Sequence, residues 1–428
     1  MASHFPIEQV RNNFPALSRL EGEKAVIYFD GPGGTQMADY AIESMYRYMK
    51  RGMANLHGTF QTSIETELVI SEAREAVSDL LGCEEKEVAF GANMTTLAFS
   101  IARSLNDYIR EGDEIVVTEL DHHANIDPWI KLANDKGATI KFIELSKESL
   151  SLNLENIDEV ITKKTKIVAV GLSSNVTGTV TDISKIVERA KEVNSLVIVD
   201  AVHAVPHLQI DVRTLGCDIL LCSAYKFFGP HVGIAYIRKE LFEKLSVYKL
   251  NPAPSNIPYK LETGTQNHEG ISGVRGAIKF IEELGFGETR RERLLSGMKA
   301  IEEYETELSI DLENFLRSIP DIRLYRSSKG IKTPTFAFTI DHHHSRNVTE
   351  WLAQNYNMCV ADGDFYASTM AKKLDVNKVG GWIRIGLAPY NTREEIQHFK
   401  EALLQYMKRH NENDSKTKEH ILNTNTIS

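Results

Sequence analysis

Polar residues follow five short apolar runs in the middle of the sequence, at the positions where β-strands would end. The segments are Asn93-Met94-Thr95, Asp121-His122-His123, Ser173-Ser174-Asn175, Asp200-Ala201-Val202-His203 and Ser223-Ala224-Tyr225-Lys226. Ligands of doubly wound α/β sheets bind beyond the carboxyl ends of the strands. One such segment would be ordinary, because polar residues normally resume at a strand end, but five in succession indicate a shared binding site.

Asp200 and Lys226 are the two residues of these segments with the clearest chemical potential. Asp200 directly follows the apolar run LVIV, and a buried carboxylate there must be paired, exposed or bound to a ligand. Alternatively, Asp200 caps a following helix. Lys226 is flanked by Tyr225 and Phe227, and loss of water there would make its amine nucleophilic. The alternative for Lys226 is a solvated lysine in a loop.

Met94 and Thr95 stand where an apolar-periodic helix would begin. The free N–H groups of a helix N-terminus, together with the Thr95 hydroxyl, form a typical phosphate site. The alternative is that Thr95 caps the helix. The sequence alone leaves both interpretations open.

The elements that would position these residues alternate along the chain. Expected strands cover residues 87–91, 114–118, 139–145, 166–172, 196–199, 219–222 and 232–237, and expected helices cover 95–109, 126–136, 154–161 and 183–193. The strands are almost entirely apolar, which is typical of a parallel sheet with helices on both faces. We therefore predict a large three-layer α/β domain over residues 25–285.

A smaller α+β domain is predicted from residues 286–410, with residues 1–24 and their helical segment 7–13 packed beside it. The expected elements are a long charged helix over 289–317, strands over 334–339 and 382–387, and helices over 346–356 and 393–408. Residues 411–428 contain few large apolar side chains, so we expect a frayed tail.

Length and composition bound the remaining possibilities. A chain of 428 residues exceeds the roughly 250–300 residues of a single hydrophobic core. The formal net charge of −10 argues against nucleic acid or an anionic membrane as the main partner.

The four cysteines are Cys83, Cys217, Cys222 and Cys359. They are far apart, so neither a disulfide framework nor structural zinc is expected. The N-terminus lacks an apolar signal-peptide core, and we find no apolar run of about 18 residues that could span a membrane. A cytoplasmic protein is expected.

Several segments in this order resemble one known family. They are YFDGPGGTQ (28–36), DHHANIDPW (121–129), SSNVTGTV (173–180), VDAVHAVPH (199–207), SAYKFFGP (223–230), ETGTQN (262–267) and APYNTREEI (388–396). The sequence is similar to class V aminotransferases, which are pyridoxal-phosphate (PLP) enzymes of fold type I, and within them to the cysteine desulfurase/selenocysteine lyase-like group. The resemblance covers most of the chain.

The resemblance implies a role for each matching residue. Lys226 would bond to the cofactor's aldehyde and later move the substrate's Cα proton, Asp200 would sit against the pyridine nitrogen and keep it protonated, and His122 would stack on the ring. The implied phosphate contacts are Met94, Thr95, Ser223, Tyr225 and, from the partner subunit of a homodimer with a shared active site, Thr265. Asn175 and His203 would lie near the cofactor's O3′. Arg384, Asn175, His57 and Tyr366 would bind the amino-acid substrate, with Arg384 on its α-carboxylate.

The sequence also departs from the family pattern. Tyr225 stands where many relatives have histidine, His203 where they have glutamine, and Gly58 where many desulfurases have arginine. Desulfurases carry a nucleophilic cysteine in the loop before the carboxylate-binding arginine. Here Ala361 replaces the loop's arginine and Tyr366 replaces its cysteine. The nearby Cys359 belongs to an apolar run and is interpreted as a core residue.

The sequence therefore predicts a C–S or C–Se lyase that lacks the persulfide cysteine, with an aminotransferase or amino-acid epimerase as the alternative. A metal-dependent phosphoesterase is a remote alternative, because Asp121-His122-His123 is a metal-binding motif there, but the further aspartate motifs are missing and no metal is expected. Ser223-x-x-Lys226 matches a penicillin-binding motif, but Gly229-Pro230 follows at once where a helix is required. A non-catalytic protein that binds the cofactor would not need Lys226, Asp200 and Arg384 together.

Overall fold

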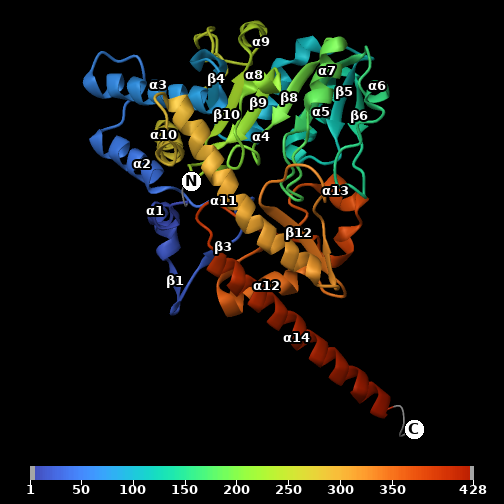
Figure 1. Ribbon diagram of the computed structural model, residues 1–428. Coiled ribbons are helices and arrows are strands. Elements are labelled where there is room, and N and C mark those ends of the chain that lie inside the picture. The colour runs from blue at the N-terminus through green and yellow to red at the C-terminus, as the bar shows by residue number, and fades with distance from the viewer. Residues whose placement is uncertain (1–4, 425–428) are drawn as a thin grey trace.

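The computed structural model describes residues 5–424, with side chains up to residue 409, and its core is a seven-stranded sheet (Figure 1). The spatial order is β4 (Val88–Gly91), β10 (Gly233–Ile237), β9 (Ile219–Ser223), β8 (Leu196–Asp200), β7 (Thr165–Gly171), β5 (Glu114–Thr118) and β6 (Thr139–Ile143). Strand β10 is antiparallel to both of its neighbours, and the remaining pairs are parallel. The mostly parallel sheet of the predicted α/β fold is confirmed.

Alternate side chains of the central strands enter two separate cores. In β8, Val197 and Val199 face one core, whereas Leu196 and Ile198 face the other. Because successive side chains of a strand point to opposite faces, a strand covered on both faces must be apolar throughout. This is why the strands read as continuous apolar runs.

Helices cover both faces of this sheet. They are α2 (Asp39–Arg51), α3 (Gln61–Leu81), α4 (Met94–Ser104), α5 (Asp127–Lys136), α6 (Ile157–Val160), α7 (Ser184–Glu192), α8 (Val212–Leu215), α9 (Lys239–Lys244) and α10 (His268–Glu283). The expected helices correspond to α4–α7, whereas α2, α3 and α10 were not predicted. Helix α3 exposes Ile64 and Leu68 while it buries Ile70 and Val77, so its apolar residues do not form one stripe.

Helix α10 escaped prediction because it is rich in glycine, which weakens helices. At Gly276, a Cβ atom would lie 2.2 Å from the carbonyl oxygen of Tyr40, in the first turn of α2. The absence of a side chain therefore lets α10 pack directly on α2, and the two helices lie together at the edge of the large domain (Figure 1).

The smaller domain is built on a four-stranded antiparallel sheet. Its order is β11 (Ile322–Leu324), β12 (Thr335–Ile340), β15 (Trp382–Gly386) and β14 (Ala361–Gly363), accompanied by α11 (Arg290–Ser318), α12 (Ser345–Tyr356), α13 (Ser368–Lys373) and α14 (Arg393–Thr424). Near the N-terminus, α1 (Ile7–Asn12) is followed by the hairpin of β1 (Leu20–Glu21) and β2 (Lys24–Ala25). Strand β3 (Ile27–Tyr28) then pairs in parallel with β13 (Met358–Cys359).

Helix α14 differs from the sequence expectation at its end. The helix continues to Thr424 and projects away from the body of the molecule (Figure 1), although a frayed tail was predicted from residue 411. The segment contains neither proline nor glycine, and nothing in its backbone chemistry therefore stops the helix. Residues 425–428 of the predicted tail lie outside the described residues.

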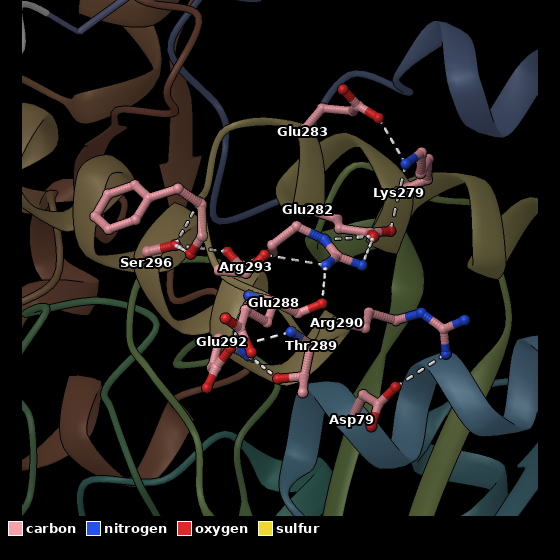
Figure 2. Close-up of polar contacts among 12 residues, drawn as sticks. Asp79, Lys279, Glu282, Glu283, Glu288, Thr289, Arg290, Glu292, Arg293 and Ser296 are labelled. Carbon is pink, nitrogen blue, oxygen red and sulfur yellow. Dashed lines mark hydrogen bonds and ion pairs between the residues drawn. The ribbon is translucent and has the colours of Figure 1, made fainter.

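Helix α11 extends from the large domain to the small one and is fixed at its start (Figure 1). A capping box closes its N-terminus: the Thr289 hydroxyl accepts from the Glu292 N–H at 3.2 Å, and the Glu292 carboxylate accepts from the Thr289 N–H at 3.0 Å. Figure 2 shows two further anchors, an ion pair of Arg290 with Asp79 on α3 and another of Arg293 with Glu282 on α10. The helix that leads into the small domain is thereby held against two helices of the large one.

The two domains also meet next to the carboxyl ends of the large sheet. The N–H of Thr333 donates to the carbonyl of Gly178 at 2.8 Å, and Thr179 forms a β-bridge with Lys332. These contacts bring β15 and its Arg384 over the edge of the large sheet. In the described part of the chain, we find no helix with the length and apolar character needed to cross a bilayer.

Candidate active site

A cavity of about 720 Å³ lies at the carboxyl ends of the central strands, where the sequence predicted a shared site. Eleven of the predicted site residues line it: Met94, Thr95, His122, Asn175, Asp200, His203, Ser223, Tyr225, Lys226, Tyr366 and Arg384. His57 and Thr265 do not. Most of the eleven residues lie together because the carboxyl ends of the parallel strands share one edge of the sheet.

Lys226 faces this cavity from the short 3₁₀ helix η5 (Ala224–Lys226). Burial, with a smaller contribution from the nearby Arg384 guanidinium, lowers the pKa of its amine to about 7. The amine donates hydrogen bonds to the carbonyls of Pro32 and Gly33, the latter at 2.9 Å. Lys226 is therefore a desolvated lysine whose neutral form is well populated near pH 7 and dominates above it, and the solvated alternative is wrong.

Asp200 ends β8 and also lines the cavity. Its carboxylate accepts from the N–H of Val202 at 2.9 Å, so it closes the turn after the strand and does not cap a helix. Burial raises the pKa of Asp200 to about 6, although the bond from Val202 and the positive charge of Lys226 both oppose this rise. The carboxylate is thus ionised at neutral pH and is poised to pair with a cationic or protonated group.

The N-terminus of α4 forms another wall of the cavity. Asn93 caps this helix, since its side-chain oxygen accepts from the N–H of Thr96 at 2.9 Å. The alternative in which Thr95 is the cap is therefore wrong. The N–H of Met94 donates to the Ser223 hydroxyl at 3.0 Å, which joins the helix to the end of β9. First-turn N–H groups beside hydroxyls suit a phosphate.

His122 is held in one orientation by its own backbone. Its Nδ1 accepts from the N–H of Ala124 at 2.9 Å, which puts the proton of the neutral ring on Nε2. Burial lowers the pKa of His122 to about 4, with Lys226 as the next contribution. The ring is therefore neutral at physiological pH, as suits contact with an aromatic or cationic ligand.

Asp121 anchors the segment that carries His122. One carboxylate oxygen accepts from the Thr118 hydroxyl at 2.7 Å and from the Gly171 N–H at 3.0 Å, and the other accepts from Asn125 at 2.8 Å. The pKa of Asp121 is raised to about 7 because burial outweighs these bonds. Both oxygens are engaged within the protein, so the Asp-His-His segment serves to position His122.

Arg384, on β15, lies at the opposite end of the cavity. The residue is buried, and its Nη2 pairs with Asp30 at 2.8 Å while its Nη1 donates to the carbonyl of Asn175 at 3.2 Å. Phe365 covers one face of the guanidinium, with 3.7 Å between its ring centroid and Cζ of Arg384. Among the side chains that line the cavity, Ser173 Oγ, Asn175 Oδ1 and Arg384 Nε are buried without a hydrogen-bond partner. Buried polar atoms of this kind require a partner, so these three atoms point to a polar ligand.

The loop that carries Phe365 and Tyr366 closes over this end. Both residues have left-handed backbones, with φ of 53° and 57°, which is uncommon for large side chains and concentrates at functional loops. The loop is held from the large domain, because the His123 N–H donates to the carbonyl of Tyr366 at 2.8 Å and Asn175 donates to that of Phe365 at 3.0 Å. The Tyr366 side chain is 71% exposed, and its ring centroid lies 5.3 Å from that of His122.

His203 and Tyr225 both line the cavity, and each contacts a neighbouring side chain. His203 Nε2 lies 2.8 Å from the Thr335 hydroxyl, which leaves Nδ1 for a ligand. Burial lowers the pKa of His203 well below its usual value, so the ring is neutral. Tyr225 stacks on His231, with 4.8 Å between ring centroids.

His57 and Thr265 lie on another part of the surface. His57 is exposed and its Nδ1 lies 3.4 Å from a carboxylate oxygen of Glu67, and Thr265 belongs to an exposed loop before α10. The prediction that His57 binds substrate does not hold within one copy of the chain. The cavity also contains His231 and Phe365, which sequence reasoning did not select, and Asp30 is bound to the guanidinium of Arg384. The Asp-Gly-Pro-Gly-Gly segment at 30–34 was a signal of a tight turn that could have drawn attention to Asp30.

Comparison with known proteins gives consistent matches. The family model described as aminotransferase class-V matches residues 27–399. A cysteine desulfurase of Yersinia pestis (strain Pestoides F) is 30% identical over 416 residues, which is 94% of this chain and 98% of that protein. A cysteine desulfurase of Enterobacter sp. (strain 638) is 29% identical over 93% of this chain and 98% of its own length. Among solved structures, the apo cysteine desulfurase of Thermococcus onnurineus NA1 has a TM-score of 0.84 at 27% identity and covers 95% of this chain and 100% of its own.

Proposed function

Because this chain belongs to the class V aminotransferase family, a family of PLP-dependent enzymes, we propose that it is a lyase for C–S or C–Se bonds of an amino acid. In this proposal the sulfur or selenium leaves directly and is not held on a cysteine of the protein. The observation that supports it most is a cavity that combines Lys226, Asp200 and Arg384 and has none of the four cysteines among its lining residues. The curated relatives that share this fold are named cysteine desulfurases.

The residues of the cavity fit pyridoxal phosphate. The first turn of α4, with Met94, Thr95 and the Ser223 hydroxyl, would hold the phosphate, and Asp200 would hold a proton at the pyridine nitrogen. His122 would cover the ring, and Asn175 and His203 would lie at the phenolic oxygen. Bound there, the cofactor would supply an electron sink for negative charge at the substrate's Cα.

Lys226 would provide the covalent bond to the cofactor and afterwards act as the base. Its lowered pKa leaves the amine neutral above about pH 7, and only a neutral amine can attack a carbonyl or accept a proton. Once free, Lys226 Nζ would take the proton from Cα of the substrate.

Arg384 would bind the substrate's α-carboxylate. A guanidinium can bond a carboxylate with two parallel N–H bonds, which fixes both position and orientation. The buried Nε of Arg384 and the Oδ1 of Asn175 lack partners within the described chain, and the α-carboxylate and α-amino group would satisfy them. Phe365 would exclude water from one face of this pair.

The environments of the cysteines support loss of the sulfur without a persulfide. Persulfide chemistry needs an accessible thiolate. Cys217 and Cys222 are buried, and burial raises the pKa of Cys217 to about 12. Cys359 lies in β13, and burial raises its pKa as well. Tyr366 stands at the mouth of the cavity instead, and its phenol can donate a proton to the leaving group.

Product analysis with L-cysteine tests this proposal. Elimination consumes one water and yields pyruvate, ammonia and hydrogen sulfide, whereas a desulfurase yields alanine and a persulfide on the enzyme. We expect pyruvate and sulfide in equal amounts, and the same products from a protein with Cys359→Ala. Alanine with protein-bound sulfane sulfur would contradict the proposal, and dependence on an added keto acid or loss of chirality at Cα would favour aminotransferase or epimerase activity.

We also propose that two copies associate and complete each other's active sites. Helices α2 and α3 both pack on α10 and expose apolar residues at helical spacing, namely Ile42, Tyr46 and Met49 on α2 and Ile64 and Leu68 on α3. Apolar side chains grouped on an exposed face are typical of an interaction surface. Thr265 lies in the loop before α10, and His57 lies between α2 and α3. A second copy on this face would therefore explain why both predicted site residues lie outside their own cavity.

The loop of Thr265 is rigidly supported, as a contribution to a neighbouring site requires. Glu262, two residues before Gly264, forms a buried ion pair with Arg74 at 2.7 Å and accepts from the N–H of Phe90 at 2.9 Å. A buried ion pair with additional hydrogen bonds fixes geometry more than it adds stability. The segment is thus anchored to α3 and β4 while Thr265 itself remains exposed.

Replacing Leu68 with arginine should dissociate the dimer. Leu68 is 56% exposed on α3, and Leu404, 49% exposed on α14, offers a matched control. We expect L68R to sediment as a monomer and to retain the cofactor about tenfold less well, roughly the loss of one charge-assisted hydrogen bond to the phosphate. The L404R protein should behave as wild type. A wild-type monomer with full cofactor affinity would contradict the proposed dimer.

A further inference from the structure

Arg384, which would bind the substrate's carboxylate, already forms an ion pair with the carboxylate of Asp30. Asp30 lies just after β3 and forms a parallel bridge with Gly386, and the Gly386 N–H donates to the carbonyl of Phe29 at 2.7 Å. This pairing runs the segment alongside β15. It brings Asp30 Oδ1 to 2.8 Å from Arg384 Nη2.

The remaining surface of the guanidinium leaves few ways to bind a second carboxylate. Nη1 donates to the carbonyl of Asn175, and Phe365 covers one face. A carboxylate gripped by two parallel bonds must use either the Nη1–Nη2 edge or the Nε–Nη2 edge. Both edges include Nη2, and one of its two N–H groups donates to Asp30. A substrate carboxylate therefore has to share Nη2 with Asp30 or displace it.

The Asp30 carboxylate is free to move without disturbing the turn around it. The turn is closed by the backbone carbonyl of Asp30, which accepts from the N–H groups of Gly33 and Gly34 at 3.0 and 3.1 Å. The side chain is 40% exposed and lies against Gly33, where a Cβ would come within 2.2 Å of Oδ2. Because Gly33 has no side chain, the Asp30 carboxylate fits over the turn. From there the carboxylate can move into solvent.

We propose that Asp30 is an internal competitor for Arg384 and sets the selectivity of the site for its substrate. The proposal rests on the proposed function in one respect, the binding of the substrate's carboxylate by Arg384. When a site is occupied in part of the protein molecules, the apparent affinity of a ligand falls in proportion to the fraction of molecules in which the site is free. Simple carboxylates would then bind poorly, whereas an amino acid would displace Asp30 with help from the contacts of its amino group and side chain.

Binding of propionate to the cofactor-loaded protein tests this inference, because propionate has a carboxylate but no amino group and cannot react. In calorimetric titrations, we expect Asp30→Asn and Asp30→Ala to bind propionate about tenfold more tightly than wild type, since removal of the competitor frees Nη2. Arg384→Gln should bind it at least tenfold more weakly. Asp341→Asn removes the same charge from the far end of β12 and should leave the affinity unchanged.

Two results would overturn the inference. If both Asp30 variants keep their thermal transition and bind propionate as wild type does or more weakly, Asp30 orients Arg384 and does not compete for it. If Arg384→Gln binds propionate as wild type does, the carboxylate site lies elsewhere. Either result is independent of the products formed from cysteine, so failure of the lyase proposal would be recognised separately.

Discussion

Replacing Lys226 with alanine is expected to lower turnover by at least about 10⁴-fold, because one side chain supplies both the covalent bond and the base. After borohydride reduction, mass spectrometry should find the cofactor on Lys226 of the wild type and on no residue of the variant. Lys244→Ala, at the exposed end of α9, is the matched control and should retain both activity and label.

The lowered pKa of Lys226 predicts how the rate of cofactor binding depends on pH. A lysine whose pKa is lowered to about 7 is neutral at pH values above it, whereas an ordinary lysine reaches that state only near about pH 10.4. The rate at which cofactor-free protein takes up pyridoxal phosphate should therefore rise through about pH 7 and then level off. A rate that keeps rising toward pH 10 would show that Lys226 is not desolvated.

Replacing Asp200 with asparagine is expected to lower turnover by about 10³-fold while the protein still binds the cofactor. The substitution keeps the shape of the side chain and removes the charge that would hold a proton at the pyridine nitrogen, and electrostatic contacts of this kind contribute about 10²–10³-fold. The amide oxygen can still accept from the N–H of Val202, so the turn after β8 should survive. Asp200→Glu should recover part of the activity, since it restores the carboxylate.

The visible spectrum distinguishes this role from a structural one. If Asp200 controls protonation of the cofactor ring, the absorbance of Asp200→Asn should change with pH differently from that of wild type at equal occupancy. An unchanged spectrum and an unchanged turnover number would contradict the assignment. If Asp200→Asn fails to fold, its thermal transition will show this. The same measurements are then made on Asp200→Glu.

Much of the site could be predicted from the sequence because it depends on local patterns. Continuous apolar runs such as LVIV indicate buried strands, and polar segments that include Asp200 and Lys226 follow these runs. The carboxyl ends of parallel strands lie at one edge of the sheet, so the polar segments that follow these strands already indicated a common cavity. The helices α2, α3 and α10 were harder to recognise, because exposed apolar residues and packing glycines obscure the amphipathic pattern.

Tertiary structure decided the contacts that no local pattern contains. Asp30 and Arg384 are separated by 354 positions in the sequence, and they meet only because the segment after β3 pairs with the end of β15. Likewise, packing of the two domains brings the Phe365 loop against Asn175, and folding within the large domain joins Asp121 to Gly171. The sequence by itself determined which side chains end the strands, because hydrophobic periodicity is local. Their partners depend on long-range packing, which the whole chain decides together.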